Sequence, residues 1–196
     1  EMSKQLPKKA IYTKFQMNTS AKDKIDADIS RITIVNEIAP NKVNIPAGDE
    51  VKSFFVLLVT LKRKDFDEKI VAMLSKLIPQ NILFVLEYNG ESKLAVYRLK
   101  VIQTGWKPTE EQSVELQGLN LDKVWENIIR SLELGVWNEE LSVDENIELH
   151  EKQAKLQKEI ARLEKQARTE KQPKKKFELV QKIKELNSKI DENEVY

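Results

Sequence analysis

The sequence contains no cysteine and only one histidine, His150, among its 196 residues. The absence of cysteine excludes disulfide bonds and thiolate catalysis. Structural zinc sites draw mainly on Cys and His, so the composition also argues against a zinc site. A nucleophile–histidine–acid triad would have to use His150, which stands among Glu and Lys in a helical repeat and not in a predicted cleft. We therefore expect neither a metal centre nor triad chemistry.

Glycine and long hydrophobic runs are also scarce. The five glycines are widely separated, so no glycine-rich phosphate loop is present and nucleotide binding by that route is excluded. The longest apolar run, Phe54 to Val59, is far shorter than the roughly 20 residues that a membrane-spanning helix needs. Residues 1–10 contain lysine but no apolar core of a signal peptide. We expect a cytoplasmic protein without a cofactor.

Charge is abundant and unevenly distributed. Apolar residues make up 40% of the chain and charged residues 33%, which is enough apolar content for a folded core but more charge than a typical domain carries. Residues 151–196 contain 13 Lys/Arg against 9 Asp/Glu, whereas residues 1–150 contain 20 against 23. The composition therefore predicts a folded domain followed by a charged, basic appendage.

The first 140 residues alternate between strand and helix patterns. Residues 31–38 are rich in β-branched side chains, and the nearly continuous apolar run over 51–61 is typical of a central strand buried on both faces. A helical spacing of apolar residues follows over 65–78, and a second buried strand is predicted over 81–88. The right-handed crossover rule would join these two strands in parallel through the helix.

The pattern then changes to a hairpin and a helix. Asn89-Gly90 predicts a tight turn, because a primed turn needs positive φ at both central residues, and the return strand is expected over 93–104. An amphipathic helix is predicted over 121–134. The fold class that follows is α+β: residues 1–140 form a mixed sheet with helices packed on its faces.

The C-terminal part, residues 141–196, is predicted to be a helical arm. Leucines recur seven residues apart from Leu149 to Leu163, as in a coiled coil. One straight helix would put the apolar stripe that begins at Leu179 on the opposite side from this one. Pro173 is unfavourable inside a helix but welcome at a helix start. We therefore predict a helical hairpin that turns close to Pro173; the alternative is a kinked helix that pairs with a second chain.

A basic cluster lies where this hairpin would turn. Its simplest interpretation is a solvated helix face, and its functional interpretation is contact with nucleic-acid phosphates or with an acidic partner. Phe177 is the one aromatic residue beside the cluster, so base stacking is not indicated. The candidate contact residues are Arg162, Lys165, Arg168, Lys171, Lys174, Lys175 and Lys176.

No catalytic site is assigned. A metal-dependent nuclease would need a carboxylate, and an acid-x-Lys motif on the neighbouring strand, to hold Mg²⁺ beside a lysine. The strand that ends at Lys62 has Thr60 in place of the acid, and Glu91-Ser92-Lys93 falls on the predicted turn. A degenerate or unrecognised nuclease on the mixed sheet remains the alternative function. The residues that would have to converge for it are Glu37, Glu50, Glu87 and Lys62.

Five short segments, spread in order over nearly the whole chain, carry a family resemblance. They are Leu6–Lys9, Ala39–Ile45, Ile78–Phe84, Thr104–Trp106 and Leu163–Gln172. Together they resemble the bacterial family catalogued as domain of unknown function 4391. The family has no established activity to carry over, but the resemblance implies an accessory role around DNA. Its members often accompany helicase and DNA methyltransferase genes in restriction or phage-defence neighbourhoods.

The expected function is therefore that of a non-catalytic accessory or interaction subunit in a DNA-processing or phage-defence complex. The α/β domain would dock on a protein, and by resemblance that protein would be a helicase or methyltransferase subunit. The arm would reach nucleic acid or a second protein, and it offers a route to an oligomer.

Overall fold

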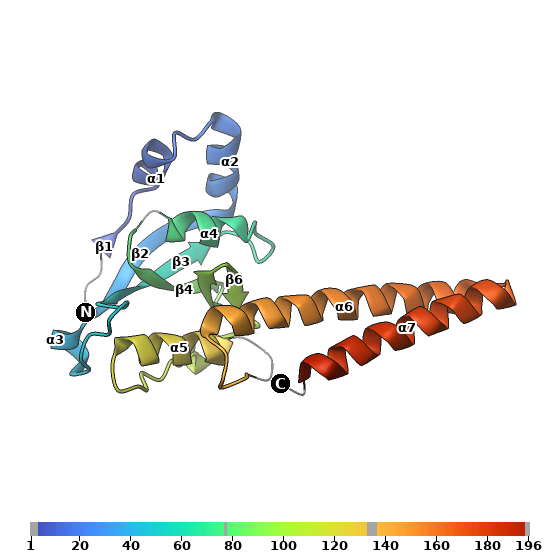
Figure 1. Cartoon of the computed structure of the whole chain (residues 1–196). Helices are drawn as coiled ribbons and strands as arrows, with labels where there is room; N and C mark the ends of the chain where they lie inside the picture. The colour runs from blue at the N-terminus through green and yellow to red at the C-terminus, as the bar shows by residue number, and fades with distance from the viewer. Residues whose placement is uncertain (1–3, 77, 133–136, 195–196) are drawn as a thin grey trace. The chain divides into compact units, whose positions relative to one another are not determined.

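The computed structural model describes residues 4–76, 78–132 and 137–194. The chain divides into two compact units, Glu1–Leu134 and Gly135–Tyr196, which we call the α/β unit and the arm and describe separately. The predicted α+β class is confirmed, because the first unit holds a mixed sheet with helices and the second a pair of helices (Figure 1). None of the helices in the described ranges has the length and apolar character needed to cross a membrane.

The sheet of the α/β unit has seven strands in the order β1-β2-β3-β4-β5-β6, with β7 paired to β5. Neighbouring strands are antiparallel except β3 and β4, which run in parallel and are separated in sequence by α4. The predicted parallel pair is thus confirmed. The strands are β1 Lys4–Gln5, β2 Ile29–Ile38, β3 Phe54–Leu61, β4 Asn81–Tyr88, β5 Glu91–Arg98, β6 Lys100–Gln103 and β7 Lys107–Pro108. The helices are α1 Lys8–Lys14, α2 Thr19–Asp28, α3 Pro40–Val43, α4 Lys69–Ser75 and α5 Leu121–Leu132.

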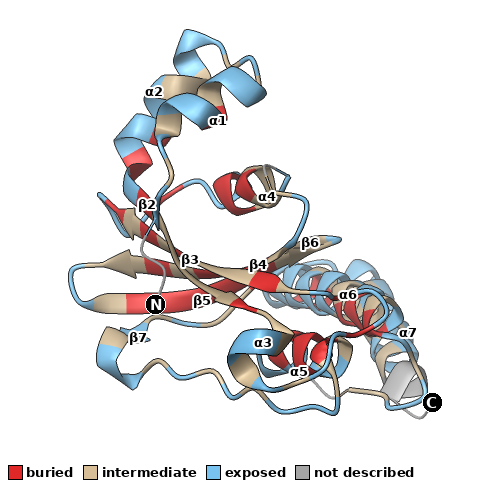
Figure 2. Ribbon diagram, turned by 90° about the vertical axis from the view of Figure 1, so that its left-hand side faces the viewer, coloured by how far each residue is buried: buried red, intermediate tan, exposed pale blue. Residues whose placement is uncertain are grey.

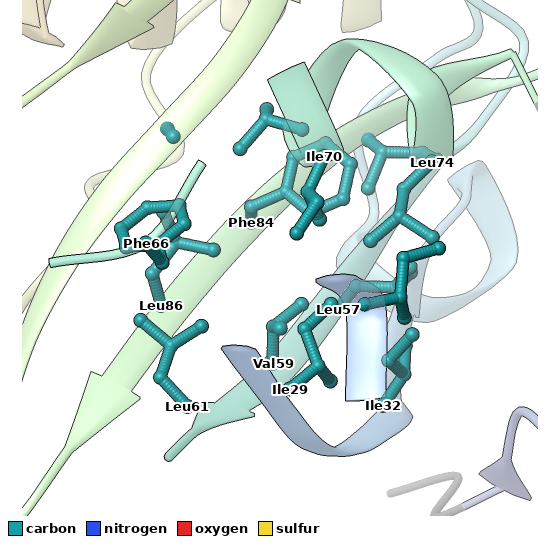
Figure 3. Close-up of a cluster of buried hydrophobic side chains, with 14 of the residues drawn as sticks. Ile29, Ile32, Leu57, Val59, Leu61, Phe66, Ile70, Leu74, Phe84 and Leu86 are labelled. Carbon is teal, nitrogen blue, oxygen red and sulfur yellow. The ribbon is translucent and has the colours of Figure 1, made fainter. Parts of the chain in front are cut away.

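Helices cover the two faces of this sheet unequally (Figure 2). On one face, Leu57 and Val59 of β3 are fully buried with Ile70 of α4 in a continuous core that also includes residues of α1 and α2 (Figure 3). On the other face, the Phe54 ring packs against Trp125 of α5 with ring centroids 5.1 Å apart. The first face therefore contains the main core, and α5 anchors the second.

Strand β3 is central, as predicted, since it pairs with β2 on one side and β4 on the other. The prediction that it is buried on both faces is only partly right. Leu57 is fully buried, whereas Val56 and Leu58, whose side chains point to the opposite face, are half-buried. A nearly continuous apolar run therefore overstated the burial of this strand, because the cover on the second face is incomplete.

Two predictions in the hairpin region need correction. The Asn89-Gly90 turn is confirmed, with φ of 50° and 81°. The return strand, however, begins at Glu91, and it is interrupted at Leu99, which has a φ of 60° and separates β5 from β6. Two β-strands joined by a very short turn need a positive φ, and here a leucine adopts it. In the N-terminal segment, α1 begins at Lys8 directly after Pro7.

The arm is a helical hairpin, as predicted. Helix α6, Val143–Thr169, and helix α7, Pro173–Glu194, run antiparallel beside each other, and Pro173 is the first residue of α7 (Figure 1). This position suits proline because the first turn of a helix needs no backbone donor there. The apolar stripe of α6 is buried at Ile160, Leu163 and Ala167, and that of α7 is half-buried at Leu179, Ile183, Leu186 and Ile190.

The first turn of α5 is tied to the loop before β3 by the carboxylate of Asp122. It accepts hydrogen bonds from the backbone N–H groups of Asp49 and Val51, both at 2.7 Å, and of Glu50 at 3.2 Å. These bonds, led by that from Val51, lower the pKa of Asp122. A Cβ at Gly48 would lie 2.1 Å from the Asp122 carboxyl carbon, so only glycine fits this close approach.

The unequal cover of β3 predicts a difference between neighbouring leucines. Leu57→Ala should lower the free energy of unfolding by about 2–5 kcal/mol, the usual cost of a cavity at a fully buried position. Leu58→Ala, on the half-covered face, should cost less than half as much. Urea denaturation of both variants measures the difference, and equal losses would show that both faces are equally well packed.

The Asp122 clamp predicts a pH-dependent effect. A carboxylate whose folded pKa is lowered stabilises the fold above its unfolded pKa of about 3.9, and this contribution disappears as the pH falls through the folded pKa. Asp122→Asn should therefore lower the thermal midpoint at pH 7, and the difference from wild type should shrink below about pH 4. Circular-dichroism melts from pH 7 to pH 2.5 test this, with the exposed Asp65→Asn as a control that should show no such trend.

A candidate interaction surface at the tip of the arm

The structure brings all seven candidate contact residues to one end of the hairpin, which we call the tip. Three lie in the last turns of α6, Lys171 lies in the connection, and three occupy the first turn of α7. From Arg162 to the end of α6 the cluster covers roughly 10 Å at 1.5 Å per residue. Every one of the seven side chains is exposed. Residues from both helices and from their connection thus form one basic surface.

The two arginines are engaged within α6. Arg162 Nη2 lies 2.6 Å from Glu159 Oε1, and this hydrogen-bonded carboxylate raises the pKa of the guanidinium. Arg168 Nη2 lies 3.9 Å from Glu164 Oε2, one helical turn away. Such exposed pairs contribute little to stability, but they neutralise part of the charge. The arginines are therefore weaker candidates for phosphate contact than the sequence suggested.

The five lysines carry the free charge. Within the described part of the chain, no ion pair involves Lys165, Lys171 or the run Lys174–Lys176. Successive helical residues point about 100° apart, so the three lysines of α7 face several directions. The C-terminus of α6 and the N-terminus of α7 meet here, and their opposite end charges largely offset each other. The lysines therefore determine the electrostatic potential at the tip.

Two apolar side chains stand beside these lysines on the outer side of α7. Phe177 is 63% exposed and Val180 is 37% exposed, whereas Leu179 and Ile183 lie on the side that faces α6. The sequence indicated Phe177 only as an isolated aromatic. Helical spacing within α7 would have shown that it lies opposite the Leu179 stripe and stays in solvent.

An open depression next to the connection carries charges of both signs. It is lined by Lys171, Lys175 and Lys182 but also by Glu170 and Glu178. A pocket for a single anion would concentrate positive charge, and this one does not. Contact with an extended polyanion over the convex surface fits the tip better than capture of a small anion in the depression.

The carboxylates considered for a nuclease do not converge. Glu37 of β2 is paired with Phe55, and Glu87 of β4 is paired with Thr60. These β3 partners are five residues apart, so the two carboxylates are separated by roughly 16 Å along the sheet. Glu37 also forms an ion pair of 2.8 Å with Lys42.

The other two residues considered for a nuclease site, Glu50 and Lys62, also lie apart from any shared site. Glu50 lies in the loop clamped by Asp122, and the Lys62 ammonium donates to the backbone carbonyl of Asp26 at 2.6 Å. In the ranges that the structure describes, no three Asp, Glu or His side chains are grouped so that they could share a metal ion. The geometry therefore gives the nuclease alternative no support.

The Glu91-Ser92-Lys93 motif lies on strand β5 and not on the turn, which corrects the sequence-based prediction. Glu91 forms an ion pair of 2.6 Å with Lys64 at the surface. The Lys93 side chain is only 9% exposed, and its ammonium lies 3.8 Å from Glu68 Oε1. The same ammonium lies 5.0 Å from the Phe66 ring centroid and 5.3 Å from that of Trp106.

Lys93 is a buried amine, the type of group that can serve as a catalytic nucleophile. Burial lowers its pKa, and the Glu68 carboxylate partly offsets this effect. Its surroundings are an aromatic pair and one carboxylate, which indicates a structural role in holding Trp106 against the sheet. The alternation of β5 could have revealed its position, because Lys93 shares a face with the buried Ala95.

His150 lies on α6, within the predicted helical repeat, and its side chain is buried. Its ring meets the Trp137 ring edge-on, with centroids 5.9 Å apart. One turn earlier, the buried Asn146 donates to the carbonyls of Asn138, Leu141 and Ser142, at 3.0, 3.1 and 3.0 Å. This part of the arm is a small folded cap at the start of α6, and it gives His150 a packing role.

Comparison with known proteins yields one match. The model of the family described as Domain of unknown function (DUF4391) matches residues 1–190, and the chain therefore belongs to this family. The resemblance seen in the sequence is confirmed. No curated protein and no solved structure matches the chain.

The lowering of the Lys93 pKa by burial predicts that the charge of this side chain is dispensable for folding. When the pKa of a lysine is lower in the folded than in the unfolded protein, its charged form destabilises the fold at pH values below the folded pKa. The folded protein loses this proton first as the pH rises, so the stability of the wild type should rise at alkaline pH. Lys93→Met keeps the packing volume and should leave the thermal midpoint at pH 7 equal to or above that of wild type. It should also remove the rise between pH 7 and pH 10. A marked loss of stability at pH 7 would show that the charged contacts dominate.

Proposed function

We propose that this member of the family is a non-catalytic accessory subunit of a bacterial DNA-processing or phage-defence complex, and that it contacts DNA through the tip of its arm. The observation that carries the proposal is the group of five exposed lysines, none of which has an ion-pair partner in the described structure. Five lysines close together repel one another, and three of them, Lys174–Lys176, are consecutive in the first turn of α7. Their presence is better explained by a polyanion that they bind.

The chemistry of the tip defines the mode of binding. Lysine contacts phosphate as a point charge, and the two arginines that could read base edges in a bidentate manner are engaged with glutamates. Phe177 is exposed beside Lys174–Lys176 and can contact a sugar or an unpaired base. We therefore propose sequence-independent binding dominated by phosphates, with a steep dependence on salt.

An accessory role also fits the rest of the described molecule. The carboxylates of the α/β unit are dispersed, and the buried lysine is held in a packed cluster. The α/β unit would then supply the contact with a partner protein, and the family resemblance suggests a helicase or methyltransferase subunit for that partner. The arm would then add a DNA contact to the complex.

A charge-removal experiment tests the tip. Lys171, Lys174, Lys175 and Lys176 are replaced together by Gln, which keeps helix propensity. The variant should bind duplex and single-stranded DNA at least tenfold more weakly at 50 mM salt. The slope of log K against log salt should fall by up to about 3 units, because fewer phosphates are neutralised. Fluorescence anisotropy over a salt series measures both.

The matched control removes the same charge from the same arm. Lys152, Lys155, Lys158 and Lys184 are exposed on α6 and α7 outside the tip cluster, and their fourfold replacement by Gln should change affinity by less than threefold. Equal losses in both variants would mean that net charge and not the tip attracts DNA. Unchanged binding of the tip variant would show that the lysines are only a solvated face.

A further inference from the structure

An apolar pocket of about 300 Å³ lies in the α/β unit on the sheet face against which α5 packs. Its floor comes from strands β2, β3, β4 and β5. Its wall is the irregular segment from Thr109 to Leu116, which follows β7. The floor residues are Ile38, Phe54, Val56, Leu83, Val85 and Leu94.

The fold leaves the middle of this floor partly uncovered, although Ile38, Phe54, Leu83 and Leu94 are buried. Val56 and Val85 lie on adjacent central strands, yet both are only half-buried. Exposed apolar area costs about 25 cal/mol per Å², so a gap over the middle of a sheet is unfavourable unless something fills it. The volume is at the lower limit for binding pockets, which suits one large side chain better than a cofactor.

The wall has the alternation of a strand but no strand partner. Gln112, Val114 and Leu116 are half-buried and line the pocket, while the residues between them are exposed. None of the recorded backbone hydrogen bonds joins residues 113–116 to another described residue. An extended segment with free N–H and C=O groups is an edge to which another extended chain can add.

Two buried oxygen atoms of the wall lack hydrogen-bond partners. Gln112 Nε2 donates to the Ser92 carbonyl at 2.7 Å, which fixes the amide and leaves its Oε1 as an unpaired acceptor. The Thr109 hydroxyl is also buried and unpaired. A buried acceptor without a donor is costly, so this part of the wall is less well satisfied than the rest of the fold.

The surroundings of the wall are acidic. Glu110, Glu111 and Glu115 are exposed on it, and residues 108–122 contain no Lys or Arg. The field along this segment therefore attracts cations and disfavours acidic ligands. A peptide uses the apolar pocket, the free backbone edge and the acidic rim at once, whereas a small apolar molecule uses only the first.

From these observations we infer that the pocket binds an extended, basic segment of a partner protein, with one apolar side chain of that segment inserted over Val56 and Val85. This inference rests on the proposed function for the existence of a protein partner. It adds the place on the α/β unit where the partner docks and the chemistry of the docking segment.

A defined peptide serves as the probe. It is a capped seven-residue peptide with a central Leu between alternating Thr and Lys, and its control has Asp in place of the Leu. The full chain, labelled with ¹³C at Leu and Val methyl groups and ¹⁵N at amides, is titrated at 100 mM salt. The Leu peptide should shift the methyl signals of Val56, Val85 and Val114 and the amides of residues 113–116. The Asp peptide should bind at least tenfold more weakly.

Two kinds of variant separate the contributions. The first variant replaces three exposed glutamates, Glu110, Glu111 and Glu115, together by Gln. Its affinity for the Leu peptide should fall at least fivefold, and its folding should not change because these side chains lie in solvent. The matched control replaces the exposed Asp23, Glu50 and Asp65 by their amides and should leave affinity unchanged. Val85→Phe fills the pocket and should abolish the methyl shifts, and its unfolding midpoint shows whether the fold is retained.

Three results would overturn the inference. One is that the Leu and Asp peptides bind equally well, or that neither peptide binds. Another is saturation of the pocket methyl groups by 1-hexanol or toluene while the peptide has no effect, which would identify a small-molecule site. The third is the same shifts on raising the protein concentration alone, which would identify a second copy of this chain as the occupant. The fourfold Gln variant of the arm tip should bind the peptide normally, so the pocket and the DNA contact can fail independently.

Discussion

The parallel pairing of β3 with β4 is the constraint on which the α/β unit depends. A parallel pair cannot be closed by a short turn, so the chain must cross over the sheet, and α4 does so on the face that holds the main core. Parallel strands are normally buried on both faces, which then requires a second layer. Helix α5 supplies it around Phe54 and Trp125. This helix does not extend over Val56 and Val85, and the apolar pocket therefore stays open above them.

The arm depends on a different constraint, the position of Pro173. A proline inside a long amphipathic helix would break the backbone ladder, and the two apolar stripes on either side of it would face opposite directions. Beginning a new helix at the proline lets both stripes meet in a hairpin. The same turn gathers Lys171 and Lys174–Lys176 at the tip, so the step that satisfies the hydrophobic pattern also concentrates the charge.

Much of the fold was predictable because it rests on local chemistry. The parallel pair, the Asn89-Gly90 turn and the hairpin at Pro173 follow from β-branched runs, from the need for positive φ and from the missing N–H of proline. The break at Leu99 was not predictable, because leucine carries no preference for the left-handed region. The basic residues of the tip could be identified from sequence alone. The pairing of Arg162 with Glu159, and hence the division between engaged arginines and free lysines, required coordinates.

The pocket escaped prediction for a physical reason that applies to central strands in general. Sequence patterns report which side chains can be buried, and Val56 and Val85 read as core residues whether another segment covers them or not. The wall, residues 109–116, has only one short 3-10 helix, Thr109–Glu111, and carries charge, so it resembles an ordinary loop. Only the coordinates show that this segment borders a pocket whose floor stays partly exposed at Val56 and Val85.

The two proposed contacts have opposite chemistry, and this difference has a mechanistic consequence. The tip of the arm is basic and convex, whereas the pocket is apolar with an acidic rim formed by Glu110, Glu111 and Glu115. DNA is repelled from the pocket and a basic peptide is repelled from the tip, so neither ligand competes for the other's surface. Salt weakens phosphate contacts much more than it weakens the burial of a leucine side chain. If both proposals hold, such a subunit would hold its protein partner through an apolar contact and would release and regain DNA through an electrostatic one.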